Sequence, residues 1–191
     1  MTAIPSPYGT IGPFFPSEFS NWTSDLTRHE GRVAQGQHIL LTGIVVEEGN
    51  QPTFNTIVEI WQPDVNGIFR HPLDLRSGEA DPGFFGWGRA RTGPDGRYRF
   101  HTVLPGSYST EEGTLRSPHI DVMILAIGLT RRLVTTVFFA DSPDPVLDCV
   151  DAEQRKRLLA RRNPDLDEEG MPAYSFDIVL RGENETPFFL D

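Results

Sequence analysis

Hydrophobic and polar residues alternate along several short stretches of the chain, which is the pattern of β-strands with one buried face. The clearest stretch runs from Arg97 to Val103. Tyr98 and Phe100 fall on one face of it, and Arg99 and His101 fall on the other. Because successive side chains of a strand point to opposite sides, this alternation predicts a half-buried strand over residues 97–103.

Other strands are indicated by stretches rich in β-branched and aromatic residues, each bounded by turn-forming residues. These stretches cover residues 39–46, 57–62, 120–129, 133–139 and 174–180. The chain has no regular alternation of strands and helices, so a parallel βαβ architecture is not indicated. We therefore expect an all-β fold, an antiparallel β-sandwich, for a domain that spans residues 38–191.

One segment carries helix signals. Asp151 can act as an N-cap, with Gln154 at the third helical position, and good helix formers continue from Arg155 to Arg162. The dipeptide Asn163-Pro164 then ends the pattern. The sequence predicts one short helix here.

Residues 1–37 show no sustained period and contain four prolines, so they read as an irregular N-terminal arm. A free arm would normally be polar, but this one carries several aromatic residues. Because apolar surface of that size is seldom left in water, we expect the arm to lie on its own domain or on a partner chain.

Charge and composition exclude several classes of function. The net charge of −10 argues against nucleic-acid binding, which needs a basic face. The longest apolar run, 122–127, is too short to span a membrane, and the N-terminus does not resemble a signal peptide. The lone Cys149 excludes an internal disulfide, and its apolar surroundings predict a buried thiol. We expect a soluble, cytoplasmic protein.

Candidate chemistry centres on Tyr108, His119 and Asp121. His119 and Asp121 are two residues apart, so on a strand they project from the same face. A phenolate, an imidazole and a carboxylate would suit a ferric or another oxophilic ion. Equally, His119 can be a half-buried histidine that simply hydrogen-bonds to a neighbouring polar group. Glycine-rich phosphate loops and nucleophile motifs are absent from the sequence.

A series of motifs resembles the signature of the intradiol ring-cleavage dioxygenases. It begins with Val58-Glu59-Ile60-Trp61-Gln62-Pro63-Asp64 and Asn66-Gly67-Ile68-Phe69-Arg70-His71. Further motifs follow in the family's order: Gly88-Arg89, Asp95-Gly96-Arg97-Tyr98, Pro105-Gly106-Ser107-Tyr108, Arg116-Ser117-Pro118-His119 and Phe176–Gly182. The similarity covers roughly residues 38–183, and it includes Thr10–Phe15 in the arm.

The resemblance implies a site of known composition. In that family a ferric ion is held by two tyrosinates, two histidines and a hydroxide, and the ring of a catechol is opened between its two hydroxylated carbons. In this chain Tyr108 matches one tyrosine, His119 the first histidine, and Arg116 the arginine that faces the catecholate. Phe69 stands in place of the other tyrosine and Asp121 in place of the second histidine. The resemblance therefore implies a vestigial site, with no metal and no catalytic residue in this chain.

This pattern is similar to the alpha, non-iron chains of the two-chain family members that cleave 3,4-dihydroxybenzoate (protocatechuate). It implies Fe(3+) held by a homologous beta subunit, a higher-order alpha–beta oligomer, and cleavage by O2 of 3,4-dihydroxybenzoate or a related substituted catechol. It also implies that the arm contacts the partner. The residues expected to line the partner's substrate pocket are Thr10, Gly12, Pro13, Phe14 and Ile127, the last in place of an arginine directed at the substrate's carboxylate.

Two other functions stay open. The first is an independent metal-binding dioxygenase that uses Tyr108, His119 and Asp121. The second is a non-enzymatic β-sandwich binding module.

Overall fold

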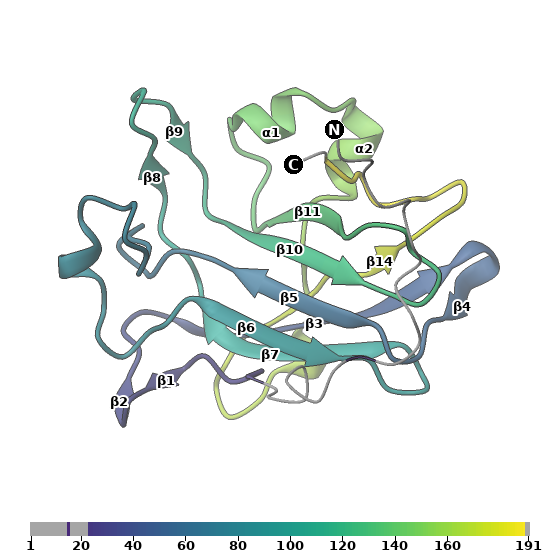
Figure 1. Cartoon of the computed structure of the whole chain (residues 1–191), viewed down its shortest axis with the longest axis horizontal. Helices are drawn as coiled ribbons and strands as arrows, with labels where there is room; N and C mark the ends of the chain where they lie inside the picture. The colour runs from purple at the N-terminus through teal and green to yellow at the C-terminus, as the bar shows by residue number, and fades with distance from the viewer. Residues whose placement is uncertain (1–14, 16–22, 190–191) are drawn as a thin grey trace, which may run out of the picture.

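Two β-sheets lie face to face in the computed structural model, which describes residue 15 and residues 23–189 (Figure 1). The first sheet has the strand order β11-β10-β5-β6. Its strands are β5 (Ile57–Trp61), β6 (Trp87–Arg91), β10 (His119–Leu125) and β11 (Leu133–Phe138). All neighbouring strands in this sheet are antiparallel.

The second sheet is built around β3 (His38–Glu47) and has the order β12-β13-β3-β14, with β4 and β7 also paired to β3. Its other strands are β4 (Gln51–Pro52), β7 (Arg97–Val103), β12 (Arg161–Arg162), β13 (Ala173–Ser175) and β14 (Ile178–Val179). Two small hairpins pair β1 (Arg28–His29) with β2 (Arg32–Val33) and β8 (Tyr108–Ser109) with β9 (Leu115–Arg116). The α-helices among the described residues are α1 (Pro145–Asp148) and α2 (Ala152–Lys156).

The core fills the space between the two sheets, because every second residue of the central strands points inward. The first sheet contributes Val58, Ile60, Ile120, Val122 and Ile124, and the second contributes Leu41, Val45, Tyr98, Phe100 and Ile178. All of these side chains are buried. The predicted all-β sandwich is confirmed.

Five of the predicted strands are present, and β10 is shorter than expected. β10 ends at Leu125 rather than at residue 129, and Gly128 then takes a positive φ of 85° in the turn toward β11. The strand β6 was missed, because Gly88 and Ala90 on its inner side do not give a hydrophobic pattern. A Cβ at Gly88 would lie 2.6 Å from Leu26 Cδ1, so the lack of a side chain there makes room for the core.

The prediction of one continuous strand over 174–180 was wrong. β13 and β14 both run parallel to β3, and the chain breaks between them. At the break, Ile44 N donates to Asp177 Oδ1 at 3.0 Å, and the Tyr98 hydroxyl donates to Phe176 O at 2.6 Å. Where the strand is interrupted, the Asp177 carboxylate thus accepts the hydrogen bond from Ile44 N that a backbone carbonyl would accept in a continuous strand.

The prediction of a single helix reaching Arg162 was also wrong. α2 has the expected capping box of Asp151 and Gln154, but it ends at Lys156. Leu158 turns inward instead and packs with Phe138 and Leu147, the latter from α1, which the pattern did not predict. The Cys149 thiol, expected to be buried, is exposed after α1.

Part of the predicted arm packs on the sandwich. Leu26 and Ala34 belong to the core, and Thr23 N donates to Arg89 O at 3.2 Å on the edge strand β6. The boundary at residue 38 and the contact of the arm with a partner chain stay predictions. In the part of the chain described here, no helix has the length and apolar character that crossing a membrane requires.

Candidate functional site

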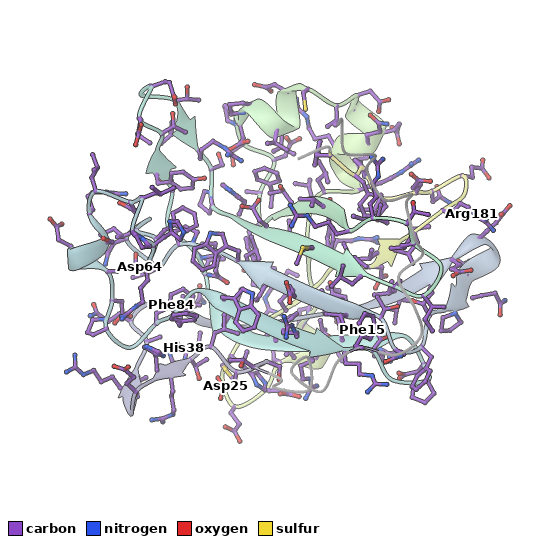
Figure 2. All side chains as sticks on the ribbon, viewed as in Figure 1. Phe15, Asp25, His38, Asp64, Phe84 and Arg181 are labelled. Atoms are coloured by element: carbon purple, nitrogen blue, oxygen red, sulfur yellow. The ribbon has the colours of Figure 1, made fainter. Side chains whose placement is uncertain are left out.

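The five predicted vestigial-site residues lie at the end of the sandwich where β5 ends and β10 begins (Figure 1). The loop that follows β5 is held by Asp64, which Figure 2 labels at this end of the molecule. Its carboxylate accepts hydrogen bonds from the backbone N–H groups of Asn66, Ile68 and Asp81 at 2.8, 3.0 and 2.8 Å. Because these bonds are made by a buried carboxylate, they fix the path of the loop that carries Phe69.

Aromatic side chains form a continuous row at this end. The Phe69 ring stacks on Trp61, with 5.7 Å between centroids, and meets Tyr108 edge-to-face at 5.1 Å. Tyr108 lies 5.6 Å from the ring of His119. The structure therefore brings together Phe69, Tyr108 and His119, three of the residues that the sequence motifs single out.

Asp121 and Arg116 complete this group. Asp121 lies opposite Trp61 on β5 and Thr136 on β11, and its Oδ1 is 3.9 Å from His119 Nε2. Arg116 Nη2 approaches the same His119 nitrogen at 3.4 Å. Its guanidinium carbon lies 6.0 Å from the centre of the Tyr108 ring. All five predicted vestigial-site residues thus form one cluster.

A buried carboxylate that the sequence analysis missed anchors this cluster. Asp144, 1% exposed, is the N-cap of α1 and accepts from Val146 N at 2.9 Å. Its other oxygen accepts from Arg116 Nε and from Ser117 N, both at 2.9 Å. The signal that could have found it is Asp144-Pro145, an N-cap residue followed by a proline at the first helical position.

Burial sets the protonation of the two titratable rings. It lowers the pKa of His119, and the nearby Asp121 carboxylate opposes this effect. Burial also raises the pKa of the Tyr108 hydroxyl, against the influence of Arg116 and with the help of Asp121 and Asp144. At neutral pH the pair is therefore a neutral imidazole and a neutral phenol, because both charged forms are poorly solvated.

These residues do not fit a ferric ion of the kind that the family resemblance implies. His119 Nδ1 lies 2.5 Å from Ser117 O and donates to it, which leaves the lone pair on Nε2. That lone pair faces the cationic Arg116 guanidinium. Phe69 supplies no oxygen. Within residues 23–189 no group of three or more His, Cys, Asp or Glu side chains is arranged to hold a metal.

A cavity of about 630 Å³ opens beside the cluster. Its walls are Trp61, Phe69, His71, Leu73, Asp74, Leu75, Arg76, Tyr108, Ser109, Thr110, Glu111 and Asp121. The contribution of residues 71–76 was missed, since this loop has no periodicity and its two leucines are exposed. Of the predicted partner-facing residues, Ile127 lies beyond the opposite end of β10 and is 45% exposed. Thr10, Gly12, Pro13 and Phe14 lie outside the described residues.

Comparisons with known proteins agree with this architecture. A family model described as "Dioxygenase" (Dioxygenase_C) matches residues 10–182. The chain is 38% identical over 172 residues to a protocatechuate 3,4-dioxygenase beta chain from Burkholderia cepacia, covering 85% of this chain and 73% of that one. It is 33% identical over 202 residues to an alpha chain from the same organism, covering 96% of each.

Among solved structures, an intradiol ring-cleavage dioxygenase from Tetranychus urticae superposes with a TM-score of 0.60 at 20% identity. The match covers 93% of this chain and 94% of that one, and it supports the fold. Together with the family model and the curated relatives, it leads to one assignment. This chain belongs to the intradiol ring-cleavage dioxygenase family.

Proposed function

We propose that this chain is the alpha, non-iron subunit of an intradiol dioxygenase of the protocatechuate 3,4-dioxygenase type and works in the cytoplasm. An iron-bearing beta subunit would hold Fe(3+) and cleave the ring with O2. The substrate would be 3,4-dihydroxybenzoate or a related substituted catechol. In this arrangement the chain contributes residues to the substrate pocket of its partner and binds no metal itself.

The observation that carries the proposal is the composition of the cluster around His119. Phe69 packs between Trp61 and Tyr108 where a working site needs a phenolate, and Arg116 faces the imidazole. Sequence identity does not separate the two subunit types, because the chain is 38% identical to a beta chain and 33% identical to an alpha chain. The composition of the site therefore supports the proposal of an alpha subunit.

The proposed roles follow the family resemblance. Thr10, Gly12 and Pro13 would shape the partner's pocket with backbone groups, and Phe14 would pack on the substrate ring. Ile127 would face the ring substituent. An apolar side chain at that place cannot neutralise a carboxylate. A catechol with another substituent would therefore fit this position as well as 3,4-dihydroxybenzoate.

Expression of the chain alone and with a beta subunit tests the proposal. We expect the isolated chain to contain no stoichiometric iron and to take up no O2 with catechols. The co-purified complex should contain one iron per chain pair and cleave at least one member of a panel of substituted catechols. Metal analysis, visible absorption and O2 consumption are the measurements. Stoichiometric iron and a tyrosinate-to-iron absorption band in the isolated chain would instead support an independent dioxygenase, and failure to bind any beta subunit would leave a non-enzymatic module.

Substitution of Gly12 tests the role of the arm. Gly12→Val should lower kcat/KM of the complex by about tenfold or more, because a side chain at a position lining the substrate displaces the ring from its productive geometry. The iron content of the complex should not change. Gly78→Val is the matched control, since a Cβ at Gly78 meets nothing within 4 Å. Loss of iron in Gly12→Val, or an equal loss of activity in both variants, would contradict the role.

A further inference from the structure

The cavity beside Phe69 has a wall that suits a ligand other than an acidic catechol. Its volume of about 630 Å³ lies in the range of small-molecule sites. Trp61, Phe69 and Tyr108 supply three aromatic rings, with centroid separations of 5.7 and 5.1 Å along the row. Packed on one another in this way, the rings give this part of the wall an apolar surface.

Acidic side chains outnumber arginine and lysine among the described residues of the wall. Among the described residues of the wall, Arg76 is the single arginine. It is engaged by protein atoms: its Nη2 donates to Gly67 O at 2.7 Å and its Nε lies 3.9 Å from Asp74 Oδ1. Asp74 also accepts from Phe69 N at 2.8 Å. With this pair balanced, the carboxylates of Asp121 and Glu111 give the described part of the wall a net negative charge.

Asp121 is placed to meet a ligand. Its side chain is 42% exposed and lies on the cavity wall, while its Oδ1 accepts from Thr136 Oγ1 at 3.1 Å. The neighbouring imidazole of His119 is 3.9 Å away and belongs to the buried cluster. A partly exposed carboxylate held in this way attracts a cation through its charge, and the neighbouring rings can pack on the apolar part of the ligand.

We propose that this cavity is a binding site for an organic cation, an ammonium group carried on an apolar or aromatic body. The ammonium would lie beside the Asp121 carboxylate. The apolar body would cover Leu73 and Leu75, which are 78% and 92% exposed at the rim. The proposal does not depend on the subunit role.

The same wall discriminates against aromatic acids. A carboxylate in this cavity would face Asp121 and Glu111, and Arg76 is already engaged with Gly67 and Asp74. Like charges in a partly desolvated site repel more strongly than in water. The site therefore selects against the very substituent that 3,4-dihydroxybenzoate carries.

Titration of the full chain with two probes of similar size and opposite charge tests the proposal. Phenyltrimethylammonium should bind with a dissociation constant of about 1 mM or below, as expected for a small ligand held by one carboxylate and an apolar wall. Benzoate should bind at least about tenfold more weakly, since 1.4 kcal/mol corresponds to a factor of ten. Calorimetry and the fluorescence of Trp61, checked in a Trp61→Phe variant, are the measurements.

Two variants that remove the same charge from different places give the control. Asp121→Asn should weaken phenyltrimethylammonium binding by about fivefold, as expected for a partly exposed charge pair. Glu48→Gln should leave it unchanged, because Glu48 pairs with Arg181 at 3.3 Å at the opposite end of the molecule (Figure 2). Equal effects of the two substitutions, tighter binding of benzoate, or no saturation by phenyltrimethylammonium up to about 10 mM would each overturn the proposal.

Discussion

Replacement of Asp144 by Asn should destabilise the protein by about 3 kcal/mol, because one buried carboxylate holds three donors from two segments. One of its oxygens accepts from Arg116 Nε and Ser117 N, and the other accepts from Val146 N. An amide can present only one acceptor oxygen, so its NH₂ group would face a donor. Arg116, whose side chain is 18% exposed, would also lose its counter-charge.

The expected loss can be measured by urea unfolding or by a melting temperature lowered by about 6–12 °C, at 2–4 °C per kcal/mol for a chain of this size. Asp148→Asn is the matched control. Asp148 pairs with Arg155 at 3.0 Å, but its side chain is 63% exposed, so its removal should cost less than about 1 kcal/mol. If both variants lost the same stability, the buried network would have no special role.

The predictable part of the fold is the part in which burial follows strict alternation. β7 shows this directly: Tyr98 and Phe100 are buried, and Arg99 between them is exposed. β3 and β5 are predictable for a related reason, since their continuous β-branched runs are buried almost throughout. In each case the side chains that build the sheet also determine the pattern read from the sequence.

The errors occur where a contact distant in sequence decides the local structure. Residues 174–180 alternate as a strand would, yet Phe176 O receives the Tyr98 hydroxyl from β7 and the strand divides there. Good helix formers continue beyond Lys156, but Leu158 gains more by burial against Phe138 than by continuing the helix. Local propensity is weak compared with such burial.

The residues of the candidate site also fall into a group that the sequence predicts and a group that it does not. Phe69, Tyr108, Arg116, His119 and Asp121 were found through ordered motifs, and they do lie together. Asp144 was not found from the sequence, because its hydrogen-bond partners Arg116 and Ser117 are 28 and 27 residues away in the sequence. Sequence spacing carries no information on such a pairing, whereas the fold brings β9 and α1 together.

Gly67 illustrates how the motifs themselves encode this arrangement. It has a positive φ of 71°, and a Cβ added there would collide with the backbone carbonyl of Ser107 and lie 3.1 Å from Tyr108 Cβ. The loop before Phe69 and the segment before Tyr108 therefore touch backbone to backbone. This close approach sets the edge-to-face contact between the two rings, which are 5.1 Å apart.

Gly67→Ala should consequently cost about 3 kcal/mol, roughly 1 kcal/mol from the left-handed backbone conformation and the rest from displacement of the Ser107 backbone. Gly113→Ala separates the two contributions. Gly113 has a similar φ of 80°, but a Cβ there meets nothing within 4 Å, so this variant should lose only about 1 kcal/mol. The free energy of unfolding in urea measures both losses, and the near-UV circular dichroism of Tyr108 and its neighbours should change in Gly67→Ala alone. Equal losses in the two variants would mean that backbone conformation, and not the contact with Ser107, makes glycine necessary at this turn.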